Sequence, residues 1–328
     1  MPYSDNFSRP ISYLRVSVTD RCDLRCIYCM PSRGVSWRSH GEILRYEEIE
    51  TVVRAAAELG ISKIRLTGGE PLVRKGLVDL MAMIGRIPGI DDLAMTTNGV
   101  LLARYAEELK AAGLKRVNVS LDTLRPERFR TITRLGKLSD TLEGIAAAKE
   151  AGLAPVKTNT VVIRGLNDDE VVDFARLTHA PDWHVRFIEV MPVGDNSDWA
   201  GNGYVPMDEV RERIERELGK LKPAKLGSGG GPARYYRLAG ARGAIGFIAP
   251  ISDHFCYQCN RLRLTADGKL RPCLLSDYEI DLRTPLRRGA TLEDIKRLIV
   301  EAVHAKPERH HLSEQVIPQG RAMSEIGG

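Results

Sequence analysis

The sequence predicts an α/β fold of six successive strand–helix units followed by a smaller α+β extension. Helix-forming stretches end at a glycine and lead into short β-branched runs, at residues 55–67, 109–120 and 148–162. The spacing of these junctions varies, which indicates successive units rather than a strict repeat. Right-handed crossovers between such units make a parallel sheet, either an open six-unit βα barrel or a doubly wound sheet.

The individual helices and strands are predicted from the periodicity of hydrophobic residues and from the glycines that end them. The predicted strands span 14–19, 63–67, 93–97, 116–120, 156–162 and 185–191. The predicted helices span 47–59, 76–86, 101–112, 140–151 and 168–178. In either architecture a ligand binds beyond the carboxyl ends of the parallel strands.

Polar residues and glycines gather where these strands end. The strand ends are residues 20–22, 68–71, 96–99, 120–122 and 189–192. One such end is typical of a turn or a helix cap. Several ends of this kind on one rim predict a functional site.

After Met191 the regular alternation of predicted strands and helices ends. The elements predicted there are helices near 207–219 and 291–304, strands at 234–238 and 244–251, and a hairpin of 261–265 with 269–273. The chain ends in Gly327-Gly328. We therefore expect two parts, residues 1–192 as the partial barrel and residues 193–328 as the extension.

The amino-acid composition argues against several classes of protein. The chain has 328 residues, with 48 Lys and Arg against 43 Asp and Glu, for a net charge of +5. This small excess argues against an electrostatic nucleic-acid scaffold and fits a pocket for an anionic small molecule. There is no run of about 18 apolar residues that could span a membrane, and the polar segment 1–10 has no secretory signal. We expect a cytoplasmic protein that binds neither nucleic acid nor membrane.

All six cysteines fall into two triplets, which predicts metal ligation in a reducing compartment rather than a disulfide framework. The first triplet is Cys22-x-x-x-Cys26-x-x-Cys29, directly after the first strand. Three thiolates this close can wrap one iron–sulfur cubane and leave one iron open to an exchangeable small molecule. Structural zinc is the alternative, although zinc prefers a fourth ligand and the next histidine, His40, is distant in sequence.

The second triplet is Cys256-x-x-Cys259 followed by Cys273, again without a fourth cysteine. Zinc is a stronger alternative here, because His254 could complete a four-ligand site. Arg261 and Arg263 follow directly. An open iron flanked by arginines resembles a substrate site in which guanidinium groups bind phosphates.

The spacing of the first triplet, with Tyr28 before the third cysteine, resembles the signature of radical S-adenosylmethionine enzymes. The Gly68–Pro71 segment resembles that superfamily's receptor for the methionine amino group, in which a carboxylate can hold an ammonium. With the second triplet, the whole chain resembles the GTP 3′,8-cyclase family of molybdenum cofactor biosynthesis. The stretches that carry this resemblance are 14–22, 28–31, 64–72, 96–99, 118–122, 186–191, 256–264 and the terminal Gly-Gly. It implies an incomplete (βα)6 barrel of TIM type whose C-terminal α+β extension carries a second Fe–S cluster.

The resemblance also implies residue roles. Cys22, Cys26 and Cys29 hold a [4Fe–4S] cluster whose open iron binds S-adenosylmethionine. The residues that line the S-adenosylmethionine pocket are Tyr28, Gly69, Ser120 and Met191. The second [4Fe–4S] cluster, which meets the guanine, is held by Cys256, Cys259 and Cys273. The GTP contacts are Arg15, Arg65, Thr96, Lys157, Arg261, Leu262 and Arg263, of which Arg15, Arg261 and Arg263 are the catalytic candidates.

The implied reaction is that of a lyase. A 5′-deoxyadenosyl radical takes the ribose 3′ hydrogen of GTP, and the ribose radical attacks guanine C8 to give (8S)-3′,8-cyclo-7,8-dihydroguanosine 5′-triphosphate. The implied partners are an electron donor such as flavodoxin or ferredoxin, the cyclic pyranopterin monophosphate synthase that receives the product, and a second copy in a homodimer. The terminal Gly-Gly is expected to reach the site, because glycine can approach a crowded cluster.

Overall fold

The computed structural model describes residues 2–193, 202–226, 230–312, 318 and 320–327. The first strands along the chain are β1 (Tyr13–Ser17), β2 (Lys63–Thr67), β3 (Asp92–Thr97), β4 (Arg116–Ser120), β5 (Val156–Val162) and β6 (Trp183–Glu189). The later strands are β7 (Lys222–Pro223), β8 (Arg234–Arg237), β9 (Ile245–Ile248), β10 (Arg261–Leu264), β11 (Lys269–Arg271) and β12 (Ile280–Asp281). Within the described residues they form one 12-stranded sheet in the order β12-β11-β10-β1-β2-β3-β4-β5-β6-β9-β8-β7.

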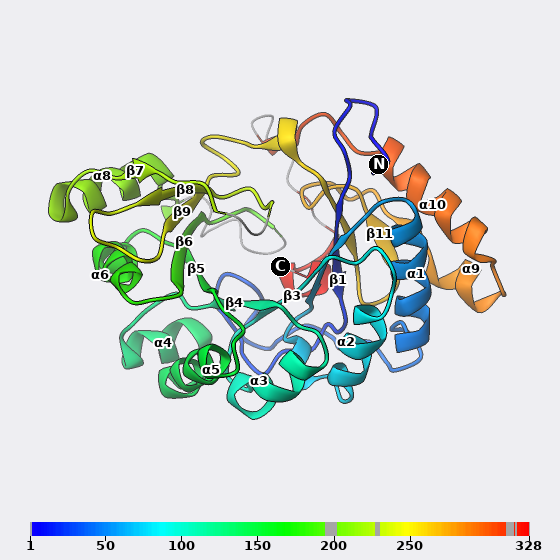
Figure 1. The fold of residues 1–328 in the computed structure, drawn as a ribbon, viewed down its shortest axis with the longest axis horizontal. Helices are drawn as coiled ribbons and strands as arrows, with labels where there is room; N and C mark the ends of the chain where they lie inside the picture. Colours follow the sequence, from blue (N-terminus) through cyan, green and yellow to red (C-terminus); the bar gives the residue numbers. More distant parts are fainter. Residues whose placement is uncertain (1, 194–201, 227–229, 313–317, 319, 328) are drawn as a thin grey trace.

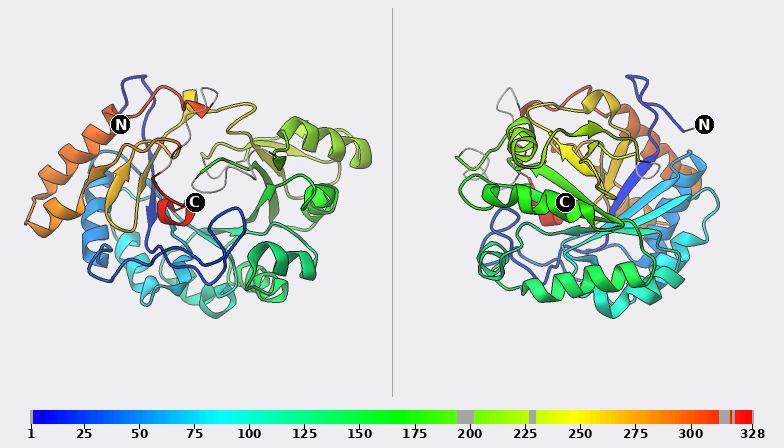
Figure 2. Two further views of the ribbon diagram at one scale, coloured as in Figure 1. Left: turned by 180° about the vertical axis from the view of Figure 1, so that it is seen from behind. Right: turned by 60° about the vertical axis from the view of Figure 1, so that its left-hand side comes forward.

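Strands β1 to β6 are parallel and lie side by side in chain order. A doubly wound sheet reverses its strand order part-way, whereas consecutive right-handed crossovers leave every helix on one side. Figures 1 and 2 show the sheet curving into an open barrel with its helices outside. The prediction of an incomplete (βα)6 barrel is therefore confirmed, and the doubly wound alternative is wrong.

The outer layer consists of the helices that connect these strands. They are α1 (Tyr46–Glu58), α2 (Leu77–Gly85), α3 (Leu102–Ala111), α4 (Pro126–Thr133), α5 (Leu138–Glu150) and α6 (Val171–Arg176). Short 3-10 turns accompany them at η1 (Pro71–Val73), η2 (Asp168–Glu170) and η3 (Leu177–His179). The sequence predicted each of the helices except α4. None of the helices in the described part of the chain has the length and apolar character needed to cross a membrane.

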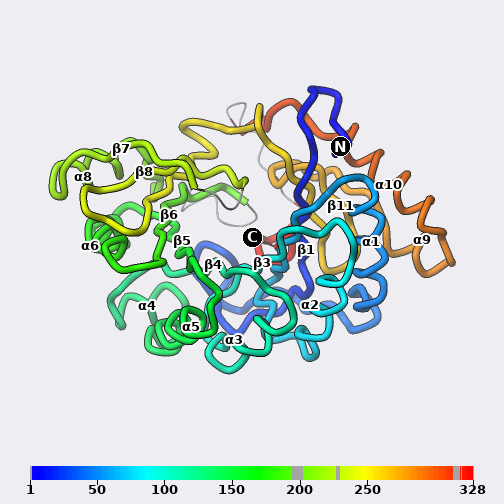
Figure 3. The backbone as a smooth tube through the Cα atoms, in the orientation of Figure 1, coloured from blue at the N-terminus to red at the C-terminus, as the bar shows by residue number. Residues whose placement is uncertain are grey.

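The C-terminal residues extend both edges of the partial barrel. Strand β9 pairs in parallel with β6, and β10 pairs in parallel with β1. The predicted hairpin is confirmed by the antiparallel pairing of β10 with β11. The remaining helices are α8 (Met207–Leu218), α9 (Arg283–Arg287), α10 (Leu292–His304) and α11 (Met323–Ile326). The tube in Figure 3 follows the chain as it returns past β1 to end inside the barrel.

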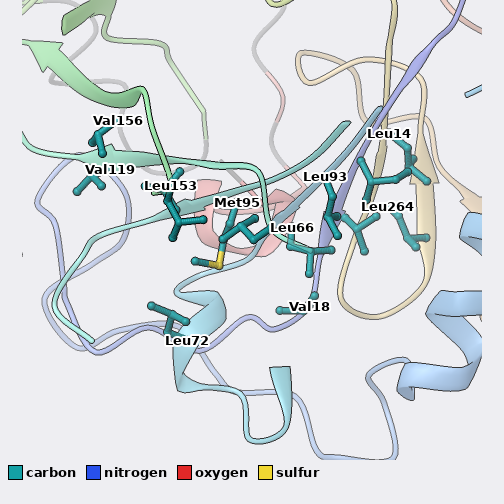
Figure 4. Packing of buried hydrophobic residues seen from close by; sticks show 14 of the residues in the cluster. Leu14, Val18, Leu66, Leu72, Leu93, Met95, Val119, Leu153, Val156 and Leu264 are labelled. Carbon is teal, nitrogen blue, oxygen red and sulfur yellow. The ribbon is translucent and has the colours of Figure 1, made fainter. Parts of the chain in front are cut away.

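The two faces of the curved sheet differ in chemistry because successive strand residues point to opposite sides. Leu14, Leu66 and Met95 belong to the buried apolar cluster between sheet and helices (Figure 4). The residues next to them along β1 and β2, Arg15 and Arg65, instead face the interior of the barrel. This alternation directs charged side chains inward, where they form the wall of a cavity.

Candidate active site

A cavity of about 320 Å³ lies inside the barrel and collects residues from most of the chain. All six cysteines line it as free thiols: Cys22, Cys26, Cys29, Cys256, Cys259 and Cys273. So do most of the other residues selected from the sequence: Arg15, Tyr28, Arg65, Gly69, Thr96, Ser120, Met191, Arg261 and Arg263. The structure therefore brings these residues to one place, at the carboxyl ends of the parallel strands.

The first triplet lies in the loop that follows β1. The Cys29 N–H donates to the Cys26 carbonyl at 2.9 Å, which turns the chain between these two cysteines. The loop is held to the end of α4, where the Arg25 N–H donates to the Thr133 carbonyl at 2.9 Å. Burial raises the pKa of the Cys26 thiol, and the neighbouring Cys29 adds to this effect. A positively charged metal centre offsets such a cost by stabilising the thiolate.

The second triplet is assembled by the turn η4 (Cys256–Gln258) and by the β10–β11 hairpin. The hairpin returns Cys273 to the neighbourhood of Cys256 and Cys259. Arg261 Nη2 lies 3.6 Å from Cys259 Sγ. Burial raises the pKa of Cys259, but Arg261 and Lys306 outweigh it and lower the value to about 6. The side chains around Cys259 thus favour the thiolate that a metal requires.

The described residues contain no three Cys, His, Asp or Glu side chains that converge as the ligands of one metal ion do. A cubane does not require that convergence, because each thiolate binds a separate iron. Two groups of three free thiols that line one cavity have the donor chemistry that iron–sulfur clusters require. His254, the candidate fourth zinc ligand, packs its ring 5.7 Å from that of His310, measured between centroids.

Tyr28 is fixed to the opposite wall of the cavity by Asp122. The Tyr28 hydroxyl donates to Asp122 Oδ2 at 2.6 Å, and the Val161 N–H donates to Asp122 Oδ1 at 2.9 Å. Burial raises the pKa of Asp122 to about 6, although both hydrogen bonds act in the opposite direction. Asp122 thereby joins the cysteine loop to the ends of β4 and β5.

Gly69 allows the loop after β2 to lie directly against the residues that follow β1. Its N–H donates to the Thr19 carbonyl at 2.8 Å, and the Glu70 N–H donates to the Arg21 carbonyl at 2.8 Å. A Cβ atom on Gly69 would stand 2.3 Å from the Arg21 carbonyl oxygen. Only glycine permits so close an approach of two backbones.

Glu70, the carboxylate of the Gly68–Pro71 segment, is held by hydrogen bonds within the protein. The Glu70 carboxylate accepts hydrogen bonds from the Leu72 N–H at 3.0 Å, the Thr97 hydroxyl at 2.8 Å and the Asn98 N–H at 2.6 Å. It is buried and does not belong to the cavity wall. These three donors leave an acceptor site on the carboxylate open, so the expectation that it holds an ammonium group stays a prediction. In this structure Glu70 ties the end of β2 to the end of β3.

Strand register places three arginines in one row. Arg15 on β1 is the register partner of Arg263 on β10 and of Arg65 on β2. Burial lowers the pKa of all three guanidinium groups, and the charge of Arg263 lowers that of Arg15 further. Arg186 on β6 also lines the cavity. A wall with this concentration of positive charge attracts an anionic ligand.

Several buried polar atoms on this wall have no hydrogen-bond partner among the described residues. They are Arg65 Nε, Thr96 Oγ1, Asn159 Oδ1, and Arg186 Nε and Nη2. An unsatisfied buried donor or acceptor costs about 1–3 kcal/mol. A bound group with several acceptor oxygens would satisfy the arginine donors, so the wall fits a phosphate-bearing ligand.

Two of the selected residues, Lys157 and Leu262, have side chains that do not line the cavity. Lys157 is buried on β5, with Nζ 5.8 Å from the centroid of the Tyr235 ring. Burial lowers the pKa of Lys157 to about 7, and Arg186 contributes to this shift. Leu262 packs into the apolar cluster on the outer face of β10.

The C-terminal helix α11, red in Figures 1 and 2, lies inside the curved sheet. Met323 and Ser324 line the cavity, and Arg263 Nη1 donates to the Gly327 carbonyl at 3.1 Å. Gly327 has a φ of +79° and packs so closely that a Cβ atom would stand 2.9 Å from that of Ser17. The terminal Gly328 lies outside the described residues.

Sequence reasoning gave no individual role to Asn98 and Asp122, which lie in the predicted strand ends, and it did not select the lining residues Asn159, Arg186 and Lys306. Polar residues at alternate positions of a strand were a usable signal for Asn159 and Arg186, which are register partners on β5 and β6. Lys306 had no local signal. Its Nζ donates to the Arg261 and Pro272 carbonyls at 2.9 and 2.6 Å, a contact that depends on the tertiary fold.

Comparison with known proteins first defines the class. The sequence model of the Radical SAM superfamily matches residues 16–178, and that of Molybdenum Cofactor Synthesis C matches residues 183–312. SuiB of Streptococcus suis, solved with its precursor peptide SuiA, has a TM-score of 0.64 at 13% identity over 86% of this chain. SuiB bound to S-adenosylmethionine gives a TM-score of 0.62, and this chain covers 64% of that chain. The likeness to SuiB shows a shared fold, and the matching sequence model places the chain in the class of radical S-adenosylmethionine proteins.

Similar sequences then narrow the class to a family. The GTP 3′,8-cyclase of Pelotomaculum thermopropionicum is 60% identical, over 99% of both chains. The proteins of the same name from Heliobacterium modesticaldum and Thermodesulfovibrio yellowstonii are 57% and 54% identical, also over 99% of each chain. The chain therefore belongs to the GTP 3′,8-cyclase family. Its superfamily uses S-adenosylmethionine and an iron–sulfur cluster as cofactors.

Proposed function

We propose that this chain converts GTP to (8S)-3′,8-cyclo-7,8-dihydroguanosine 5′-triphosphate, the first step of molybdenum cofactor biosynthesis. The observation that carries this proposal is that two cysteine triplets and a row of arginines line one cavity. The name shared by relatives that match 99% of the chain supports the same conclusion.

The first triplet is assigned to S-adenosylmethionine. Cys22, Cys26 and Cys29 would hold a [4Fe–4S] cluster, and three ligands leave one iron open to the cosubstrate. The residues assigned to its pocket are Tyr28, Gly69, Ser120 and Met191, all of which line the cavity. The closeness of Gly69 to Arg21 and the hydrogen bond from Tyr28 to Asp122 would keep this pocket in shape.

The second triplet is assigned to the guanine of GTP. Cys256, Cys259 and Cys273 would hold a second [4Fe–4S] cluster. The residues assigned to GTP are Arg15, Arg65, Thr96, Lys157, Arg261, Leu262 and Arg263, of which Arg15, Arg261 and Arg263 are the catalytic candidates. A triphosphate carries about four negative charges near neutral pH, which suits this number of cations.

When bound, the cofactors supply the 5′-deoxyadenosyl radical that removes the ribose 3′ hydrogen, after which a bond forms to guanine C8. The chain's own residues bind and orient the reactants. Arg65 Nε and Thr96 Oγ1, which lack partners in the described residues, would bind phosphate or ribose oxygens. The side chains that line the cavity would limit the access of water to reactive species and hold the reacting atoms in position.

Turnover tests the proposal. Anaerobically reconstituted protein should convert GTP and S-adenosylmethionine into a cyclised triphosphate, 5′-deoxyadenosine and methionine, measured by liquid chromatography and mass spectrometry. Cleavage of S-adenosylmethionine without any GTP-derived product would contradict it.

A second experiment tests the substrate assignment separately. Replacing Arg261 and Arg263 together with Ala should weaken GTP binding in equilibrium dialysis. Arg297→Ala is the control, because that arginine is exposed on α10 and pairs only with Asp294 among the contacts found for its side chain. Unchanged GTP affinity in the double variant would favour a radical enzyme with another substrate.

Metal analysis distinguishes the second cluster from a zinc site. A brown protein whose iron is lost in part when Cys256, Cys259 and Cys273 are replaced would support the cluster. Stoichiometric zinc at the second triplet would instead support the zinc alternative.

Partners and organisation are part of the same proposal. We expect a cytoplasmic homodimer that receives electrons from a donor such as flavodoxin or ferredoxin and passes its product to the cyclic pyranopterin monophosphate synthase. Residues 1–192 would act as the S-adenosylmethionine part, and residues 193–328 would supply the second cluster. Sedimentation velocity and reduction by purified flavodoxin test the first two points directly.

A further inference from the structure

Arg321, at the start of the C-terminal tail, is held by two carboxylates at once. Its Nη1 and Nη2 each donate to an oxygen of Asp267 at 3.0 Å. Its Nε and Nη2 donate to the two oxygens of Glu279 at 2.6 and 2.8 Å. The Arg321 side chain is 8% exposed, so these contacts are largely removed from water. The planar guanidinium of Arg321 thus forms two bidentate ion pairs, a geometry that a lysine side chain cannot reproduce.

Both carboxylates belong to the edge of the sheet that carries the second triplet. Asp267 lies in the turn between β10 and β11, where it also accepts a hydrogen bond from the Thr265 hydroxyl at 2.6 Å. Glu279 directly precedes β12. The strands of this edge carry Arg263 and lead into Cys273. Arg321 therefore fastens the tail to the structure that supports the second triplet.

Beyond Arg321 the tail crosses toward the first triplet. The Ser324 N–H forms a hydrogen bond with the Cys29 thiol. Arg38, in the loop after Cys29, lies 3.5 Å from carboxylate oxygens of both Asp267 and Glu325. The helix α11 that spans this path has only four residues, too few to be stable without tertiary contacts. Its position must therefore come from the contacts that hold it.

We propose that Arg321 is a positioning residue for the reaction: its double ion pair fixes α11 between the two cysteine triplets and sets Gly327 against Arg263. Ile326, which is 1% exposed and packs near Val193 and Leu275, is the apolar contact at the other end of the tail. Without Arg321, Asp267 keeps its ion pair with Arg38, and Glu279 keeps its ion pair with Arg271. The sheet edge should thus remain folded while the tail loses the ion pairs that anchor it.

Hydrogen exchange of the protein before cluster reconstitution tests whether Arg321 anchors the tail, independently of activity. In Arg321→Ala, amides of residues 322–327 should exchange about 100-fold faster, because removing one side of a buried ion pair is strongly destabilising. Arg321→Lys should fall between Arg321→Ala and wild type, since it keeps the charge but loses the fork. Arg297→Ala, whose guanidinium is 77% exposed, should leave the tail unchanged. Wild-type exchange of the tail in Arg321→Ala would overturn the proposal.

The activity measurement rests on the proposed function. Arg321→Ala and deletion of residues 327 and 328 should each lower kcat for GTP, and the combined variant should be no worse than the deletion alone. Losses that multiply in the combined variant would show that Arg321 acts other than through the tail, and would overturn the proposal. If GTP is not the substrate, no variant turns it over, but the exchange experiment still decides whether Arg321 holds the tail.

Discussion

The close contact at Gly69 permits a quantitative test of how the S-adenosylmethionine pocket is shaped. In Gly69→Ala the new Cβ atom would stand 2.3 Å from the Arg21 carbonyl oxygen, 2.6 Å from its carbonyl carbon and 2.9 Å from the Asp20 carbonyl oxygen. All three are backbone atoms, which cannot turn aside as a flexible side chain can. An ordinary carbon–oxygen contact is about 3.4 Å, so the two segments would have to separate by about 1 Å.

Two hydrogen bonds cross this contact. The Gly69 N–H donates to the Thr19 carbonyl and the Glu70 N–H to the Arg21 carbonyl, both at 2.8 Å. A separation of about 1 Å takes both beyond hydrogen-bonding distance. Each bond contributes about 1 kcal/mol, and residual overpacking adds about 1–2 kcal/mol, so the free energy of unfolding should fall by about 3–4 kcal/mol. The corresponding fall in Tm is roughly 5 °C.

Thermal unfolding of the anaerobic protein and equilibrium dialysis with S-adenosylmethionine measure the two consequences. Gly41→Ala is the matched control, because a Cβ atom there meets only Ser39 Oγ, at 3.9 Å. Gly69→Ala should unfold at a lower temperature than Gly41→Ala and bind S-adenosylmethionine more weakly. Equal Tm values together with equal affinities would refute the reasoning that this backbone contact shapes the pocket.

Three further predictions concern other residues around the cavity. Tyr28→Phe removes the donor to Asp122 Oδ2 and should lower the free energy of unfolding by about 2 kcal/mol in urea titrations; an unchanged value would mean that this bond does not hold the loop. Burial lowers the pKa of Lys157 to about 7, so between about pH 7 and pH 9 the unfolded chain keeps a proton that the folded chain has released, and stability rises with pH through this group. Lys157→Met should remove that rise when urea midpoints are compared at the two pH values, whereas a slope equal to that of the wild type would count against it. Cys26→Ala should abolish cleavage of S-adenosylmethionine and Cys259→Ala should impair GTP use; comparable loss of GTP binding in both would contradict this division.

The barrel was predictable because its units repeat a local pattern. Four of the five predicted helices between strands end near a glycine, as in α3, whose C-terminus is followed by Gly113, and the helix at 168–178 is the exception. The helix α4 was missed because it is short, begins at Pro126 and contains the β-branched Thr131, Ile132 and Thr133. What holds it is burial of Phe129 and Ile132, a tertiary contact that local propensity does not report.

The cavity was predictable only in part, for a related reason. The cysteines were found because the residues of each triplet are close in sequence or lie on one hairpin. The contacts of Glu70 were not predictable, because the sequence does not reveal that backbone N–H groups bind its carboxylate. Arg186 and Arg321 act through strand register and through contacts between distant segments, which a single sequence does not display.

The two cysteine triplets are proposed to hold one cluster each within a single cavity, and iron content tests this most directly. Iron and sulfide per chain would be measured after anaerobic reconstitution of the wild type and of two variants in which one triplet or the other is replaced by Ala. The wild type should hold about eight irons and each variant about four, with GTP turnover confined to the wild type. About four irons in the wild type, or zinc in place of iron at either triplet, would contradict it.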